Sequence, residues 1–233
     1  MRRSNPDLSV LSGASALPYP AEDIIAALQE VVLPERLERL RVVAAARIAS
    51  VTVVLESVID PHNTAAVLRT SDAHGVGEVH MIEQGHKPLL AKRVTRGCER
   101  WMDIVLHRAT APCVSGLRLR GYELWLADMS GTATLEEVAR RPKVALVFGN
   151  EHLGASAEMR AACAGTFAVP MRGMVESLNV SVAAGITLHT VTKHRPGDLG
   201  EDAVRALRAR FLMESVRNPE LVIERWRQTR GRS

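Results

Sequence analysis

The sequence predicts an α/β protein with a mostly parallel β-sheet covered by helices. Three observations support this class. Strand-like and helix-like patterns alternate along residues 51–194. Several strands are continuous apolar runs, such as VTVVLES (51–57) and KVALVFG (143–149), which is typical of strands buried on both faces. The 233 residues, of which 46% are hydrophobic, can also build a substantial core.

The N-terminal part, residues 1–49, is expected to be an irregular segment followed by a helical extension. Residues 4–20 are rich in Ser, Pro and Gly, which disfavour regular structure. Apolar residues then recur at helical spacing from Ala21 to Ala49. Pro34 indicates the start of a second helix, because proline is tolerated in a first helical turn.

The middle of the chain, residues 50–195, carries the predicted sheet. Strands are expected, in order, at 51–57, 78–83, 103–108, 123–128, 143–149 and 165–170. Helices are expected at 63–75, 89–97, 156–163 and 178–194. Residues 196–233 are predicted to form a helical tail that is first acidic and then basic.

Charge and cysteine usage limit the classes of function. The formal net charge is +4, and arginines gather at both ends, at Arg2 and Arg3 and in RWRQTRGRS (225–233). Basic ends suggest a polyanionic partner, although a GC-rich genome would also favour arginine. The three cysteines are far apart, which indicates neither a disulfide framework nor a metal site. No apolar run resembles a signal peptide or a membrane span, so a cytoplasmic protein is expected.

Three polar stretches follow predicted strands, and the first is DPHNTAAVLRTSDAHGV (60–76). Asn63 could cap the helix that follows it. Arg69 lies six residues later and could reach the edge of the sheet where α/β proteins bind ligands. A capped helix carrying a solvated arginine would explain the same residues.

The second stretch is VALVFGNEHLGAS (144–156), where Gly149 ends a strand and Asn150, Glu151 and His152 follow at once. The spacing of Gly149 and Gly154 fits neither the P-loop nor the dinucleotide-binding fingerprint. A glycine-rich turn without a ligand would also explain this pattern.

The third stretch is VPMRGMVESLNVSVAAGITLH (169–189). Gly173 frees the backbone of a polar loop, while Ser177 and Asn179 offer polar groups around a helix start. The small residues SVAAG (181–185) allow another backbone to approach closely. The simpler alternative is a capped helix with a tightly packed face.

Together the three stretches resemble motifs one, two and three of the SpoU/TrmH family of SPOUT RNA 2′-O-ribose methyltransferases. They occur in the family's order, and the resemblance covers residues 50–193. The segment RGCERWMDIVLHR (96–108) places Arg96, Gly97 and Trp101 as the family's tRNA guanosine enzymes do. Residues 1–30 have no matching segment.

The resemblance implies a fold, a cofactor and an assembly. The C-terminal part of the sheet domain would be threaded into a deep trefoil knot. The cofactor would be S-adenosyl-L-methionine, and the protein would act as a homodimer with shared sites. Backbone groups at four positions would hold the adenine, namely Ala127, Gly149, Val169 and Leu178.

The resemblance also implies 2′-O-methylation of tRNA, at guanosine 18 in the D-loop. The family gives the central role to Arg69, which we expect to bind phosphate and stabilise a developing alkoxide, because a guanidinium stays protonated. A role for Arg69 as a base remains open. The other expected catalytic residues are Asn63, Glu151, Ser177 and Asn179. RNA contacts are expected at Arg96, Trp101, Arg172, Arg225, Arg227 and Arg230.

Three alternatives remain. A ribosomal-RNA methyltransferase of the same group would usually carry a separate N-terminal domain, for which the roughly 50 residues before the first strand are too few. A non-catalytic RNA-binding module would not need the five polar site residues. A nicotinamide or nucleotide enzyme would need a G-x-G-x-x-G motif after the first strand, which the sequence lacks.

Overall fold

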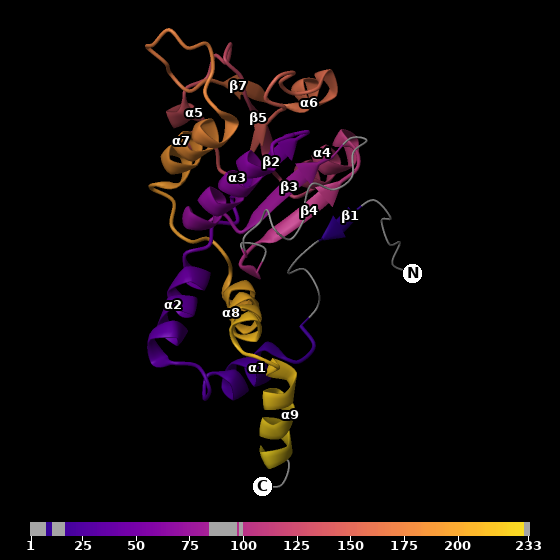
Figure 1. Ribbon diagram of the computed structural model, residues 1–233, viewed down its shortest axis with the longest axis vertical. Coiled ribbons are helices and arrows are strands. Elements are labelled where there is room, and N and C mark those ends of the chain that lie inside the picture. The colour runs from indigo at the N-terminus through magenta and orange to yellow at the C-terminus, as the bar shows by residue number, and fades with distance from the viewer. Residues whose placement is uncertain (1–7, 11–16, 84–96, 98–99, 231–233) are drawn as a thin grey trace.

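The computed structural model describes residues 8–10, 17–83, 97 and 100–230. Its sheet contains seven strands: β1 (Leu8–Val10), β2 (Val51–Glu56), β3 (Glu78–Ile82), β4 (Asp103–His107), β5 (Glu123–Ala127), β6 (Val144–Phe148) and β7 (Gly165–Phe167). Their order across the sheet is β1-β4-β3-β2-β6-β5-β7 (Figure 1). Strands β2 to β7 pair in parallel, and all six occur where the sequence predicts strands.

Strand β1 lies in a segment that the sequence predicts to be irregular, so this prediction is wrong for residues 8–10. Leu8 and Val10 pair antiparallel with His107 and Val105 of β4. This short strand obtains its hydrogen bonds from the free edge of β4, a partner that lies far along the chain. Local composition therefore could not reveal it.

Helices cover both faces of the sheet, as predicted (Figure 1). One face carries α3 (Pro61–Ala73), α5 (Leu135–Ala139) and α7 (Val180–Thr192), whose apolar residues pack with Val53, Leu146 and Phe148. The other face carries α4 (Thr110–Leu119) and α6 (Ala157–Ala162), which pack with Val54 and Val147. Helices α4 and α5 were not expected. The predicted helix 89–97 lies outside the described residues apart from Gly97.

Helix α3 begins earlier than the sequence predicts, and its cap is a different residue. Pro61 occupies the first turn, and the Asp60 side chain accepts a hydrogen bond of 2.8 Å from the backbone nitrogen of His62. The expectation that Asn63 caps this helix is therefore wrong. Because Asp60 already satisfies the helix start, the amide of Asn63 is free for other partners.

Residues 21–45 and 201–230 form a separate helical cluster (Figure 1). Its helices are α1 (Ala21–Leu28), α2 (Pro34–Ala45), α8 (Glu201–Ser215) and α9 (Pro219–Arg230). They share a core that includes Ile24, Leu40, Phe211 and Ile223. The basic tail is thus a packed helix rather than a free extension. None of the described helices is long and apolar enough to cross a lipid bilayer.

Candidate active site

The four positions expected to hold the cofactor lie along one edge of the sheet. Ala127 ends β5, Gly149 directly follows β6, and Val169 follows β7 by two residues. Leu178 lies two residues before α7. Strands β6, β5 and β7 are neighbours, so their carboxyl ends present three loops side by side. This edge is where open α/β sheets bind ligands.

The loop after β6 is closed on itself. Asn150 and Gly154 exchange backbone hydrogen bonds of 3.0 and 2.9 Å. The Asn150 side-chain oxygen accepts from the backbone nitrogens of His152 and Leu153, both at 2.9 Å, while its amide donates to the carbonyl of Ser57 at 2.8 Å. Gly154 has a φ of 68°, which favours glycine. The sequence pattern assigns no role to Asn150, although its amide ties this loop to Ser57, the residue that follows β2.

Three side chains from the three motifs form one hydrogen-bonded chain. The Asn63 amide nitrogen donates to Glu151 at 2.9 Å, and the Asn63 oxygen accepts from the Asn179 amide at 2.9 Å. Asn63 is 8% exposed, so both ends of its side chain are satisfied away from bulk water. The polar groups therefore fix the relative positions of α3, the loop after β6 and the start of α7.

Asn179 also begins helix α7, as the sequence indicates. Its side-chain oxygen accepts from the backbone nitrogen of Ser181 at 2.8 Å and from the Ser181 hydroxyl at 2.6 Å. The same side chain thus caps a helix with its oxygen and binds Asn63 with its nitrogen. A change at Asn179 would disturb both contacts.

Glu151 holds the start of the first motif. Its carboxylate accepts from the backbone nitrogens of Ile59 and Asp60 at 3.1 and 3.3 Å, besides the Asn63 amide. Burial alone would raise the pKa of Glu151, but these hydrogen bonds outweigh it and lower the pKa below the ordinary value of 4.5. A carboxylate that accepts three N–H groups suits an organising role, because it stays ionised at neutral pH.

Replacing Glu151 with glutamine should destabilise the fold at neutral pH by about 1–3 kcal/mol, because one side-chain oxygen cannot serve three donors. A carboxylate whose pKa is lower in the folded than in the unfolded protein stabilises the fold at pH values above its unfolded pKa. This stabilisation is lost as the pH falls from the unfolded pKa through the folded pKa. The difference in melting temperature from the wild type should therefore shrink below pH 4.5. Glu136→Gln, on the exposed side of α5, is the matched control. An equal decrease in melting temperature for both variants would contradict the organising role of Glu151.

The other expected site residues are less constrained. Arg69 is exposed on α3, and its side chain makes no hydrogen bond or ion pair with the described part of the chain. Helix α7 packs closely beside it, since a Cβ atom at Gly185 would lie 3.8 Å from the Thr70 side chain. Ser177 and Arg172 lie in the exposed loop before α7. These side chains are free to meet a ligand.

Apart from Arg172, the described residues that are expected to contact RNA lie on or against the helical cluster. Trp101 packs edge-on against Phe211, with ring centroids 5.5 Å apart, and the Arg36 guanidinium lies 5.2 Å from its ring. Arg227 pairs with Asp23 at 3.3 Å. Arg225 and Arg230 are exposed on α9, and Arg96 lies outside the described residues.

A buried carboxylate that the sequence did not single out supports the same edge. Glu56 is 2% exposed at the end of β2. It accepts from the hydroxyls of Thr110 and Ser156 and from the backbone nitrogen of Ser156, each at 2.8 Å. A charged residue closing an apolar strand, as in VTVVLES, was the available signal. Glu56 links α4 and α6 to the central strand.

Comparisons with known proteins identify the family of this chain. The model of the family described as "SpoU rRNA Methylase family" matches residues 50–189. The tRNA (guanosine(18)-2'-O)-methyltransferase of Escherichia coli (strain K12) is 30% identical over 192 residues, covering 82% of each chain. A solved structure of the A. aeolicus TrmH/SpoU tRNA modifying enzyme has a TM-score of 0.70 at 28% identity, covering 79% of this chain and 98% of that one.

A second solved structure, an AdoMet-bound rRNA methyltransferase from Sinorhizobium meliloti, has a TM-score of 0.57 at 25% identity. It covers 66% of this chain, and the match covers 60% of that one. The family match spans the whole parallel part of the sheet and all three motif stretches. This protein belongs to the SpoU rRNA methylase family.

Proposed function

We propose that this protein transfers the methyl group of S-adenosyl-L-methionine to the ribose 2′-hydroxyl of guanosine 18 in tRNA. The observation that carries the proposal is the hydrogen-bonded chain of Glu151, Asn63 and Asn179, which joins the three motifs at one sheet edge. The names of two relatives support a tRNA substrate. The cofactor-bound relative supports S-adenosyl-L-methionine.

The carboxyl edge of the sheet fits this cofactor, because bare backbone segments meet there. A Cβ atom at Gly131 would lie 2.2 Å from the backbone of Phe167, and one at Gly149 would lie 2.4 Å from the backbone nitrogen of Ala155. S-adenosyl-L-methionine supplies a methyl group activated by its sulfonium. Backbone groups near four positions would hold its adenine: Ala127, Gly149, Val169 and Leu178.

The side chains at this edge would position and activate the ribose. Arg69 would bind the phosphate beside the target nucleotide and stabilise the negative charge that develops on the 2′-oxygen. The hydroxyl proton would pass to that phosphate or to water, because the guanidinium cannot accept it. Asn63, fixed at both ends, would hold the first motif for this task, and Ser177 would face the ribose.

The test is to incubate the purified protein with S-adenosyl-L-methionine and a tRNA transcript, and to map the 2′-O-methyl groups. Methylation at guanosine 18 is expected, and a transcript with 2′-deoxyguanosine at that position should not react. Methylation at another nucleotide would contradict the proposed position. Cofactor binding without any transfer would favour the non-catalytic alternative.

Ribosomal RNA is the second candidate substrate, because the family description and the Sinorhizobium relative both name it. The same assay with ribosomal-RNA fragments separates the two. Preferential methylation of those fragments would identify ribosomal RNA, rather than tRNA, as the substrate.

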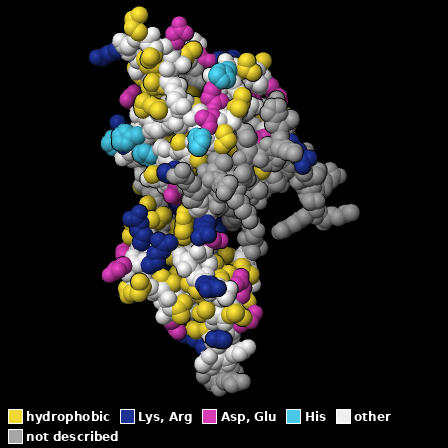
Figure 2. All heavy atoms as spheres, viewed as in Figure 1, with side chains coloured by type: hydrophobic (Ala, Val, Ile, Leu, Met, Phe, Trp, Pro, Cys, Tyr) yellow, Lys and Arg dark blue, Asp and Glu magenta, His cyan; other side chains and the backbone are white. Residues whose placement is uncertain are grey.

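Lys and Arg side chains gather along the helical cluster and its junction with the sheet, which suits an RNA surface (Figure 2). The double variant Arg225→Gln/Arg230→Gln should weaken tRNA binding. Its slope of log K against log salt should become shallower by about 1 for each phosphate that the variant no longer neutralises. Deleting residues 225–233 would be a poorer test, because Trp226 packs in the helical core. Arg140→Gln, exposed on the sheet domain, is the control. Unchanged tRNA affinity of the double variant would remove α9 from the RNA surface.

A homodimer with shared sites belongs to the same proposal. Val182 and Ile186, one turn apart on α7, are 49% and 40% exposed, and Met174 in the preceding loop is fully exposed. An uncovered apolar face of this kind favours a protein partner. Light scattering should give twice the chain mass of 25.4 kDa, and Val182→Glu/Ile186→Glu should halve the measured mass. A fully active monomer would contradict shared sites.

A further inference from the structure

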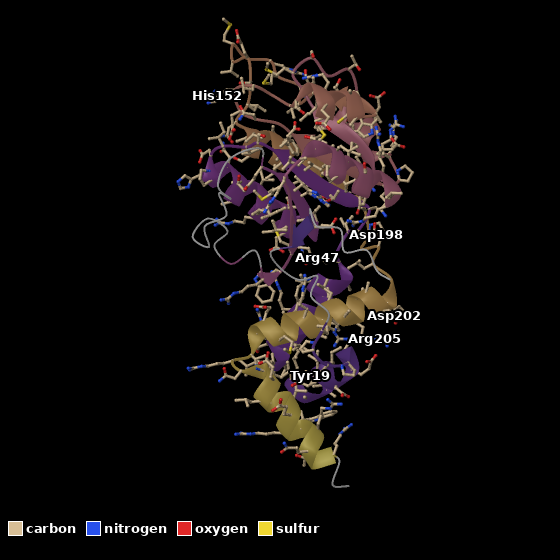
Figure 3. All side chains as sticks on the ribbon, turned by 90° about the vertical axis from the view of Figure 1, so that its right-hand side faces the viewer. Tyr19, Arg47, His152, Asp198, Asp202 and Arg205 are labelled. Carbon is tan, nitrogen blue, oxygen red and sulfur yellow. The ribbon has the colours of Figure 1, made fainter. Side chains whose placement is uncertain are left out.

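A cavity of about 510 Å³ lies at the opposite edge of the sheet from the candidate active site. Its walls include the amino ends of three strands, at Val51, Glu78 and Asp103, and the α8 residues Ala206 and Leu207. Five-residue strands separate the two edges by about 16 Å. The cavity therefore belongs to the junction between the sheet and the helical cluster, near Arg47 and Asp198 (Figure 3).

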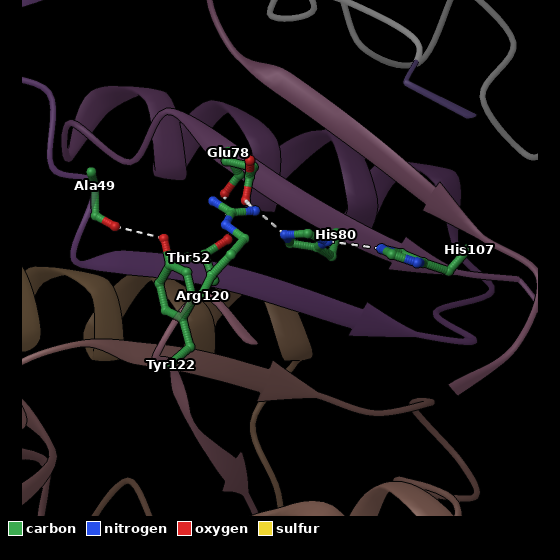
Figure 4. Close-up of polar contacts among 7 residues, drawn as sticks. All are labelled: Ala49, Thr52, Glu78, His80, His107, Arg120 and Tyr122. Carbon is green, nitrogen blue, oxygen red and sulfur yellow. Dashed lines mark hydrogen bonds and ion pairs between the residues drawn. The ribbon is translucent and has the colours of Figure 1, made fainter. Parts of the chain in front are cut away.

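Two neighbouring carboxylates form part of the polar wall. Glu78 and Asp103 are directly paired residues of β3 and β4, so their side chains leave the sheet together. One carboxylate oxygen of Glu78 accepts hydrogen bonds from Nε2 of His80 and Nη1 of Arg120, both at 2.7 Å (Figure 4). One carboxylate oxygen of Asp103 accepts a hydrogen bond of 2.6 Å from Nη1 of Arg210. Within the described residues, the second oxygen of each carboxylate has no hydrogen-bond donor.

These two carboxylates are partly exposed to the cavity, but burial shifts their pKa values differently: it outweighs the Arg210 contact at Asp103 and raises that pKa. The side chains of Glu78 and Asp103 are 25% and 27% exposed. Burial alone would raise the pKa of Glu78, but the hydrogen bonds from His80 and Arg120 lower it to about 2. Glu78 is therefore ionised at neutral pH and can accept N–H groups from a ligand.

The same wall offers donors. The Arg120 side chain is 46% exposed, donates to Glu78 through Nη1, and lies 5.3 Å from the centre of the Tyr122 ring. Arg47 and Arg210 also line the cavity, and their guanidinium groups add positive charge to this wall, although the unpaired Nε–H of each is itself buried. Three guanidinium groups beside two carboxylates disfavour a free cation, and the open carboxylate oxygens disfavour a free anion. A neutral ligand with both N–H donors and an acceptor on one edge fits best.

The remaining wall sets the shape of this ligand. Leu207 and Ala206 of α8 supply an apolar side, and Trp101 contributes an aromatic side chain. Apolar walls with a few convergent polar groups are typical of sites for small planar molecules. The volume of about 510 Å³ is sufficient for a nucleobase with its ribose.

We infer that this cavity is a second nucleoside site that binds the guanine base. Guanine carries two adjacent N–H groups, at N1 and N2, for the open oxygens of Glu78 and Asp103. Its O6 and N7 are acceptors that arginine commonly binds, and Arg120 is the exposed donor here. Adenine would place its unprotonated N1 against a carboxylate and offer one amino group. The site therefore selects guanosine over adenosine.

Two sources could supply the base, a free guanine nucleoside or a guanosine turned out of an RNA strand. Calorimetry with guanosine, inosine and adenosine measures the first. A short single-stranded RNA with one guanosine, compared with the same RNA carrying inosine, measures the second. Guanosine should bind at least about tenfold more tightly than adenosine, with inosine between them because it lacks the N2 amino group. Selectivity in either arm supports the site and identifies the source.

Variants place the binding in the cavity. Asp103→Asn removes a carboxylate while keeping its size, and Ala206→Phe fills the apolar side; each should weaken guanosine binding at least about tenfold. Asp202→Asn, at a position on α8 where the aspartate side chain is 97% exposed, is the matched control and should bind normally. Melting temperatures verify that each variant is folded.

The outcomes that overturn the inference are distinct from a failure of the proposed methyl transfer. The inference is wrong if guanosine does not bind or binds no more tightly than adenosine. Binding that is abolished in Arg69→Ala but kept in Asp103→Asn places the nucleoside at the opposite edge, which also contradicts the inference. Guanosine binding kept in Arg69→Ala and abolished in Asp103→Asn supports it, whatever RNA is methylated.

Discussion

Replacing Arg69 with alanine should lower the single-turnover rate of methyl transfer to tRNA by a factor of about a hundred or more. The loss of one preorganised charge stabiliser costs on the order of 3 kcal/mol in the transition state. Affinity for S-adenosyl-L-methionine should be almost unchanged, because Arg69 lies on α3, whereas the expected cofactor positions follow β5, β6 and β7. Calorimetry gives the affinity, and rapid quenching gives the rate.

Arg69→Lys tests whether catalysis needs only a positive charge at this position or the planar guanidinium group with its two parallel N–H donors. An ammonium cannot bind a phosphate through two parallel hydrogen bonds, so this variant should recover little of the rate. The fold should be intact in both variants, since Arg69 is exposed and makes no contact within the described residues that another side chain depends on. Transfer by Arg69→Ala at the wild-type rate would show that Arg69 is a solvated helix residue.

Replacing Gly149 with alanine should reduce the affinity for S-adenosyl-L-methionine by about tenfold or more. The added Cβ atom would lie 2.4 Å from the backbone nitrogen of Ala155 and 2.5 Å from the backbone carbon of Gly154. Backbone cannot rotate away as a side chain can, so the loop after β6 has to move, at a cost of about 1–3 kcal/mol. Both the cofactor edge and the Glu151 contacts depend on this loop.

The matched control is Gly116→Ala in α4, where an added Cβ atom meets no atom of the described chain within 4 Å. This variant should bind the cofactor normally and should be at least as stable, because alanine favours a helix. Calorimetry and thermal melting measure both variants. Normal cofactor affinity in Gly149→Ala would place the cofactor away from the loop after β6. Gly173 is a different case, since a Cβ atom there meets open space among the described residues.

The parallel sheet could be predicted because its central strands, β2 and β6, are runs of apolar residues that only a doubly covered sheet can bury. The motif residues could be located because polar groups after such strands must lie at one sheet edge. The cap of α3 was missed because Asp60 and Asn63 are both good capping residues. Only the position of Pro61, which fixes the first turn, decides between them. The trefoil knot, the dimer and the roles of the site residues stay predictions.

Local periodicity and residue type were enough to predict the six parallel strands, the helices α3, α6 and α7, and the three stretches that carry the candidate chemistry. Which of these groups meet depends on the tertiary structure. Three contacts join residues that are far apart in the sequence. They are the hydrogen bonds of Asn63 to Glu151 and Asn179, the pairing of β1 with β4, and the packing of α1 and α2 against α8 and α9. The cavity beside Glu78 and Asp103 exists for the same reason. Such contacts depend on how whole elements pack, which a local pattern does not encode.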